Sequence, residues 1–184
     1  MGKKLDQLTP ELTTFIHDQK IFFVGTAAGD GRVNISPKGM DTMRVIDSNR
    51  LVWLNLTGSG NETAAHLLRN SRMTIMFCAF DGKPLILRLY GKAKVYHPRD
   101  TSFSQYMNMF NETAGARQIM EMTIDLVQTS CGFAVPLMEY QQDRSILKEW
   151  AIKQGDSGIH EYWERKNQHS IDGYETNILN RDTN

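Results

Sequence analysis

This chain has no excess of either charge and few cysteines, and each of these features argues against a class of protein. The 184 residues contain 21 lysines and arginines against 21 aspartates and glutamates, so the formal net charge is zero. Nucleic-acid-binding proteins usually carry a basic excess, so this balance argues against that class. The two cysteines, Cys78 and Cys131, lie in apolar or strand-like surroundings. We expect buried, reduced thiols in a cytoplasmic protein, and no metal site.

Long apolar runs and the glycine motif of dinucleotide-binding folds are also missing. No apolar run reaches the roughly 20 residues that a membrane span requires. The N-terminal residues 1–7 include two lysines but no apolar segment, so we expect no signal peptide. No Gly-x-Gly-x-x-Gly follows the first predicted strand, which argues against a dinucleotide-binding domain. No linker or repeat divides the chain, and we expect one domain over residues 1–184.

The chain does contain a clear strand–turn–strand pattern within Phe23–Gly39. Gly29–Gly31 has the composition of a tight turn, because glycine adopts positive φ without steric cost and aspartate tolerates it. Residues 21–26 before the turn are apolar and β-prone, and residues 32–36 after it alternate polar with apolar. This pattern predicts a β-hairpin whose second strand ends in Ser36, Pro37 and Lys38.

Further strands follow, interrupted by few helices. Thr9 is a suitable N-cap for a helix that begins at Pro10. We predict a helical region from residue 98 to about 122 with a break at Gly115, two C-terminal helices within 144–168, and a mobile polar tail from Ser170. The expected fold is mainly β with attached helices (α+β), an antiparallel barrel of six to seven strands with its core in residues 12–136. The other predicted strands are 43–47, 50–55, 73–77, 85–96 with a bulge or corner at Gly91, and 124–133.

A second motif lies in the short helix that begins after Gly58–Gly60. The N-terminus of a helix attracts anions, because its first backbone N–H groups are unpaired and its dipole is positive there. Asn61 and Thr63 stand at this position, although Asn61 would also serve as an ordinary helix cap. Together the two motifs suggest a β-barrel that holds a phosphorylated cofactor.

These motifs carry a resemblance. In order and spacing, Phe23–Gly39, Leu51–Leu67, Arg72–Phe77 and Leu87–Gly91 resemble the pyridoxamine 5′-phosphate oxidase-related family, the FMN-binding split barrels, and the match covers about residues 12–97. The resemblance implies a homodimer with two FMN molecules at the interface between subunits. It also implies that the strand 33–38 lies along the flavin, that Lys38 reaches toward the phosphate, and that residues 59–63 receive the phosphate.

The candidate cofactor-binding residues each have a structural alternative. Lys38 is otherwise a solvated lysine at a strand end, and Pro37 a strand terminator. Arg88 needs a partner, either the ligand or a carboxylate, while Ser130 and Cys131 are more simply a buried core pair. We identify no catalytic side chain and no metal ligand. The full candidate set is Asn34, Ile35, Ser36, Pro37, Lys38, Ser59, Asn61, Thr63, Arg88, Ser130 and Cys131.

The chain departs from the oxidase that gives this family its name. The oxidase has an Arg-Lys pair at the phosphate helix, where this chain has Glu62 and Thr63. Glu62 must therefore point away or pair, with Arg69 or Arg88 as candidates. No match to the oxidase's C-terminal arginine motif follows residue 136, and a helical tail stands there instead. We therefore do not expect oxidation of pyridoxamine phosphate.

Three functional hypotheses remain. The first is an FMN-dependent oxidoreductase with an unidentified small-molecule substrate. The second is a non-catalytic protein that binds or carries a flavin, a deazaflavin or haem. The third is a structural protein whose cofactor site has degenerated, a hypothesis that rests on Glu62. None of them involves nucleic acid or a membrane.

Overall fold

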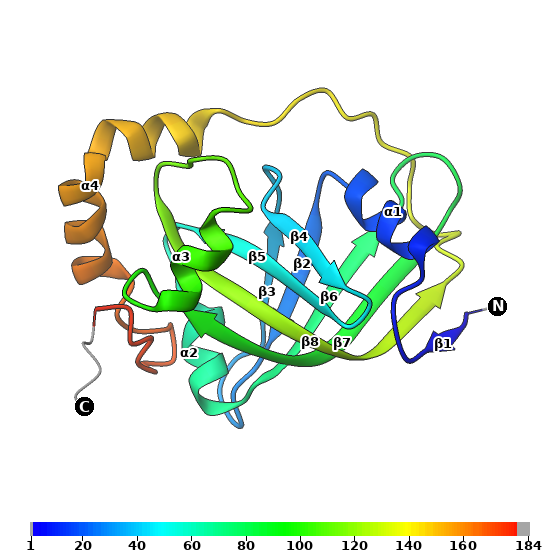
Figure 1. Cartoon of the computed structure of the whole chain (residues 1–184), viewed down its shortest axis with the longest axis horizontal. Helices are drawn as coiled ribbons and strands as arrows, with labels where there is room; N and C mark the ends of the chain where they lie inside the picture. The colour runs from blue at the N-terminus through cyan, green and yellow to red at the C-terminus, as the bar shows by residue number, and fades with distance from the viewer. Residues whose placement is uncertain (1, 180–184) are drawn as a thin grey trace.

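The computed structural model describes residues 2–179, which form one antiparallel sheet with helices around it (Figure 1). The elements are β1 (Lys4–Leu5), α1 (Pro10–Asp18), β2 (Phe22–Thr26), β3 (Asn34–Lys38), β4 (Met43–Asp47), β5 (Arg50–Leu56), α2 (Glu62–Arg69), β6 (Arg72–Cys78), β7 (Ile86–Tyr96), α3 (Thr101–Met107), β8 (Ala116–Ser130) and α4 (Ile146–Lys166).

The strand order shows where the barrel is open. The eight-stranded sheet runs β3-β2-β6-β7-β8-β5-β4, and the short β1 pairs with β8 outside this path. Every pair is antiparallel. The strands β3 and β4 are the two ends of the path and do not pair with each other among the described residues. The predicted fold class, an antiparallel split barrel with attached helices, is confirmed.

The core fills the inside of this curled sheet. Strands β2, β6 and β7 alternate buried and less buried residues, as strands with one face on a core should. The Phe22 ring packs against Trp53 and Phe77, with ring centroids 6.3 Å and 5.8 Å away. Each large apolar side chain buried in this way contributes about 1.5–3 kcal/mol, so the core holds the split barrel together.

Three local predictions agree with the structure. Thr9 caps α1, since its Oγ1 accepts a hydrogen bond from the backbone N–H of Leu12 at 3.3 Å. Gly31 in the predicted hairpin turn has φ of +81°. At Gly91 the register of β7 against β8 shifts, and a Cβ atom there would collide with the carbonyl oxygen of Thr123. The bulge therefore requires a glycine.

The predicted helix over 98–122 is wrong in its second half. Helix α3 ends at Met107, and β8 begins at Ala116. The first part of β8, residues 116–122, pairs with β5, and residues 119–122 also pair with β7, so the segment belongs to a central strand of the barrel. Its methionines, glutamine and glutamate favour helices locally, but pairing on both sides and burial outweigh that preference.

The predicted mobile tail is also wrong over the described residues. After α4, residues 167–178 fold back against α2 and the β2–β3 turn, with a β-bridge between His169 and Glu175. Thr176 and Ile178 are buried. We call residues 167–178 the C-terminal strap. The strap is held against the rest of the chain by hydrogen bonds with Arg32 and Glu62. The rest of the predicted tail, residues 180–184, lies outside the described residues.

The two cysteines differ from the prediction in one respect. Cys78 is buried at the end of β6, and burial raises the pKa of its thiol. Cys131 is exposed, at the start of a segment without helix or strand that crosses the outside of the molecule to α4 (Figure 1). Among the described helices, none is long and apolar enough to cross a membrane.

Candidate functional site

A polar cavity of about 350 Å³ lies at the split of the barrel. The end strand β3 forms one wall, residues of β5 and β8 form another, and the start of α2 with the loop before it closes the cavity. Six predicted residues therefore come together here from two separate segments, residues 34–38 and residues 59–63. The lining residues are Asn34, Ser36, Lys38, Asn55, Leu56, Gly58, Ser59, Gly60, Asn61, Glu62, Thr63 and Arg117.

Strand β3 presents alternate residues to the cavity. Asn34, Ser36 and Lys38 lie opposite buried residues of β2, which places them on the inner face of the sheet. Ile35 and Pro37 therefore lie on the outer face, and Ile35 is 71% exposed. Proline is tolerated because β3 is an edge strand with no partner on its other side among the described residues. The predicted run 34–38 is thus divided between two faces.

The start of α2 supplies the second set of polar groups. The side chain of Asn61, the N-cap, makes no capping hydrogen bond. Its Nδ2 donates to the carbonyl of Asn167 at 3.3 Å, and its buried Oδ1 has no partner within residues 2–179. Thr63 Oγ1 accepts a weak hydrogen bond from Asn34 at 3.4 Å. The first backbone N–H groups of α2 have no partners within the helix, so this end suits an anion.

Arg117 on β8 is the most buried charged residue that lines the cavity, and the sequence analysis missed it. Arg117 is only 3% exposed. Its Nη1 donates to the carbonyls of Gly60 at 2.9 Å and Gly58 at 3.4 Å, and to Asn167 Oδ1 at 2.8 Å. Its Nε has no partner among the described residues. All of these acceptors are neutral oxygens, so the guanidinium keeps its full charge.

Lys38 faces the same cavity from the opposite wall. Burial, and after it the positive charge of Arg117, lowers the pKa of Lys38 to about 8. Burial likewise lowers the pKa of Arg117 to about 10, so both groups remain mainly protonated at neutral pH. Neither forms an ion pair in the part of the chain that the structure describes. Two neighbouring cations without a carboxylate partner are costly to bury, unless a ligand supplies the negative charge.

Glu62 does not neutralise these cations. Both of its carboxylate oxygens accept from the backbone N–H of Ile171 in the strap, at 3.0 Å and 3.1 Å. It pairs with neither Arg69 nor Arg88, which corrects the partners that the sequence suggested. The guanidinium of Arg69 instead stacks on the Tyr174 ring, 4.0 Å from its centroid. The carboxylate is thus engaged by the strap at the edge of the cavity.

Arg88, Ser130 and Cys131 do not join this cavity. Arg88 lies in a row of directly paired residues on the outer face of the sheet, with Nη1 donating to Ser130 Oγ at 3.1 Å. The same face holds a largely apolar groove of about 610 Å³ that includes Phe23, Ile35 and Met76. Cys131 is exposed just beyond β8, so the predicted buried pair of Ser130 and Cys131 is wrong.

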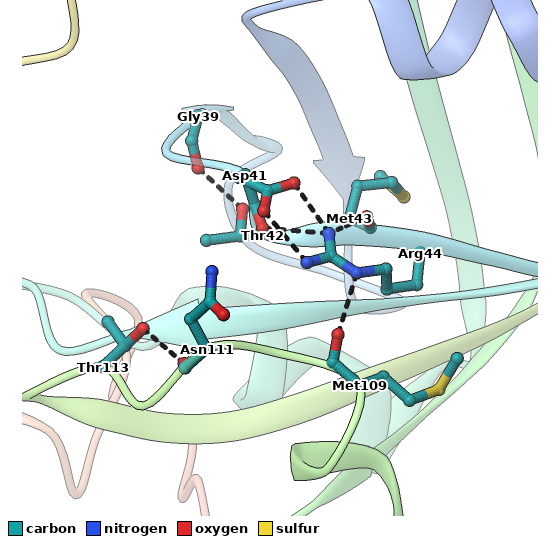
Figure 2. Close-up of polar contacts among 8 residues, drawn as sticks. All are labelled: Gly39, Asp41, Thr42, Met43, Arg44, Met109, Asn111 and Thr113. Carbon is teal, nitrogen blue, oxygen red and sulfur yellow. Dashed lines mark hydrogen bonds and ion pairs between the residues drawn. The ribbon is translucent and has the colours of Figure 1, made fainter.

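A second arginine with several hydrogen bonds, Arg44, lies at the start of β4 beside the turn from β3 (Figure 2). Met40 and Asp41 both have positive φ, at 64° and 53°, which is unusual for residues other than glycine. The Arg44 guanidinium holds both carboxylate oxygens of Asp41, at 2.8 Å and 3.0 Å, while its Nε donates to the Met109 carbonyl at 2.9 Å. Thr42 Oγ1 also donates to the Gly39 carbonyl at 2.7 Å. Arg44 therefore stabilises the conformation of the turn between β3 and β4.

The comparisons with known proteins agree with this fold. The family model described as pyridoxamine 5′-phosphate oxidase matches residues 8–131. The curated Aspergillus flavus protein ustO, of the pyridoxamine 5′-phosphate oxidase family, is 32% identical over 188 residues, an alignment that covers 91% of this chain and 75% of the relative.

Two solved structures are similar in fold. Group A Streptococcus HupZ has a TM-score of 0.52 at 18% identity, over 65% of this chain and 91% of that one. A Lactobacillus delbrueckii protein described as a candidate pyridoxamine 5′-phosphate oxidase has a TM-score of 0.53 at 20% identity. The comparison covers 67% of this chain and 94% of that one. From the family match and the curated relative, we conclude that this chain belongs to the pyridoxamine 5′-phosphate oxidase family.

Proposed function

We propose that this chain is an FMN-binding flavoprotein and acts as an oxidoreductase. The observation that carries the proposal is the pair of cations, Lys38 and Arg117, which share one cavity without a carboxylate partner among the described residues. A phosphate monoester at neutral pH carries close to two negative charges, so it would offset both of them.

The polar groups of the cavity fit the phosphate end of FMN. Arg117 Nε and the ammonium of Lys38 would donate to phosphate oxygens, together with the backbone N–H groups at the start of α2. Ser36 Oγ, buried and without a partner within residues 2–179, can donate or accept. Asn61 Oδ1 only accepts, so it suits a ligand hydroxyl rather than a phosphate oxygen.

When bound, FMN supplies the electron-transfer chemistry. The protein's contribution is to hold and orient it. The cavity volume of about 350 Å³ is at the low end for small-molecule sites, which favours the phosphate and its adjoining chain inside and the flavin ring toward the open edge of β3. The substrate and the electron donor stay unassigned.

We also propose that the protein is a homodimer with the flavin at the interface. The outer groove beside β3 is mainly apolar, and both Val33 and Ile35 are 71% exposed there. An exposed apolar surface of this kind is typical of a protein–protein contact. The groove and the cavity lie on opposite faces of the same edge strand, so a partner seated on the groove would also border the open edge of the site.

The first experiment is an absorbance spectrum of the purified protein, followed by titration with FMN and with riboflavin. We expect a flavin spectrum, FMN release on denaturation, and much weaker binding of riboflavin, because riboflavin lacks the phosphate. Anaerobic reduction of the bound flavin by NADH or NADPH would support an oxidoreductase, whereas binding without reduction or turnover would favour the carrier hypothesis. A protein that takes up no FMN would refute the proposal.

A further inference from the structure

Asn167, the first residue of the C-terminal strap, contacts three parts of the cavity lining and directly follows α4. It is fully buried, at 0% exposure. Its Oδ1 accepts from Arg117 on β8, its Nδ2 donates to the Gly58 carbonyl at 3.0 Å, and its backbone carbonyl accepts from Asn61. One side chain and one carbonyl thus connect the strand, the loop and the start of α2.

The strap holds Asn167 in place from its own side. Thr176 Oγ1 donates to the Asn167 carbonyl at 2.6 Å, and Thr176 is itself fully buried. The strap is anchored further along by Asp172, whose carboxylate accepts from the backbone N–H of Arg32 at 2.7 Å. Trp163 of α4 adds a hydrogen bond from Nε1 to Thr57 Oγ1 at 2.9 Å. Asn167 is therefore a fixed group.

The chemical identity of this residue matters more than its shape. A buried arginine usually pairs with a carboxylate, and an aspartate here would have nearly the same size as the asparagine. The amide instead gives Arg117 an acceptor without a charge, and it gives Gly58 a donor that a carboxylate lacks. Pinning Nη1 in this way leaves Nε without a protein partner among the described residues.

We propose that Asn167 is a positioning residue that orients Arg117 while leaving its charge free for the phosphate of the bound ligand. This inference rests on the proposed function, since it takes the ligand to be FMN. It concerns the phosphate only, so it predicts an effect on FMN that riboflavin should not share.

The test compares the wild-type protein with Asn167→Asp by titration with FMN and riboflavin. We expect the variant to bind FMN about 10- to 100-fold more weakly, because the aspartate neutralises Arg117 and repels the phosphate. Riboflavin affinity should change little. Asn108→Asp is the matched control, because it adds the same charge at an exposed site on the end of α3 and should leave the FMN-to-riboflavin ratio unchanged.

A pH series separates positioning from simple structural support. A protonated aspartic acid has one donor and one acceptor, like the asparagine, so acidification should restore the FMN affinity of Asn167→Asp toward the wild-type value at the same pH. A merely structural role would show no such recovery. If Asn167→Asp does not fold, Asn167→Ser removes the contact with Arg117 without a new charge, and it should weaken FMN by about tenfold while sparing riboflavin.

The outcomes distinguish the two proposals. If the wild-type protein binds no FMN, the proposed function fails. If the wild type binds FMN and both Asn167 variants keep its preference for FMN over riboflavin, the function stands and the role of Asn167 is refuted.

Discussion

Two arginines of this protein, Arg44 and Arg117, are both held by several hydrogen bonds, but by acceptors of different charge. Arg44 binds both carboxylate oxygens of Asp41 and three backbone carbonyls, those of Asp41, Met43 and Met109 (Figure 2). Arg117 is more deeply buried, and its acceptors within residues 2–179 are two carbonyls and one amide oxygen. The first is electrostatically complete, whereas the second has charge left for a ligand.

This difference suggests how to separate structural arginines from binding ones. A cation that stabilises a turn gains most when its counterion belongs to the same chain, as Asp41 does for Arg44. A cation that binds a ligand needs to be fixed in direction yet unneutralised, which neutral oxygens achieve at some cost to folding. Burial alone would not distinguish the two roles, because it says nothing of the acceptors.

The largest expected effect is on Arg117. Arg117→Met removes the charge but keeps much of the apolar length, and we expect FMN affinity to fall by about 100-fold through loss of a charge-assisted contact of about 1.5–3 kcal/mol. Riboflavin affinity should be nearly unchanged, as measured by fluorescence titration. Equal losses for both ligands would mean that Arg117 supports the fold rather than the phosphate.

Lys38 should show a somewhat smaller effect. We expect Lys38→Ala to weaken FMN binding by about 1–3 kcal/mol, because the ammonium is a point charge with a flexible stem. Calorimetric titration of wild type and variant measures the change. Unchanged affinity would remove Lys38 from the phosphate site and leave Arg117 as the main cation there.

Arg44 tests the other half of the comparison. Arg44→Met should lower the free energy of unfolding by about 1–2 kcal/mol, because the Asp41 carboxylate and three backbone carbonyls lose their donor. The turn with positive φ at Met40 and Asp41 would also lose the contacts that hold it. Urea denaturation measures this loss. The FMN-to-riboflavin affinity ratio should stay at the wild-type value, and a large fall in that ratio would contradict the separation of roles.

The smallest expected effect is the pH dependence of FMN affinity. In the ligand-free protein the pKa of Lys38 is lowered to about 8, and a bound phosphate would raise it again. Binding then takes up a proton above pH 8, so FMN affinity should fall by at most about tenfold per pH unit there. The profile of Lys38→Ala, titrated over the same range, should lack this decline.

Deprotonation of Lys38 has the opposite effect on folding: it weakens FMN binding but favours the folded, ligand-free protein. The pKa of Lys38 in the folded, ligand-free protein lies below its ordinary value of 10.5. Between about pH 8 and that value the unfolded chain binds more protons, so the contribution of this group favours the folded state as the pH rises. The free energy of unfolding of the ligand-free protein, measured between about pH 8 and 10, checks this. If Lys38→Ala abolishes the rise with pH, the lowered pKa belongs to Lys38.

The sequence predicted the β3 half of the cavity because its signal is local. Alternation, a proline and a strand-end lysine all lie within residues 34–38, and a glycine-rich turn marks the start of α2. Arg117 was missed because residues 116–122 favour a helix on their own and become a strand only by pairing with β5 and β7.

Asn167 could not be predicted for a different reason. It lies 106 residues from Asn61 and 50 from Arg117 along the chain, and no spacing rule connects such distant polar residues. Arg88 shows the converse limit. Its place between two inward-facing leucines, Leu87 and Leu89, indicated an outward side chain, but only the strand order shows that this face is separate from the cavity.

The position of the strap also sets an order of events during synthesis. The eight strands are complete once residue 130 has been translated, but Arg117 and the loop at Gly58 receive their last partners only from residues 167–176. Because translation proceeds from the N-terminus, a nascent chain contains all strands of the barrel before it contains the residues that complete the contacts of Arg117. Under the proposed function, FMN capture would therefore follow synthesis of the strap rather than synthesis of the barrel alone.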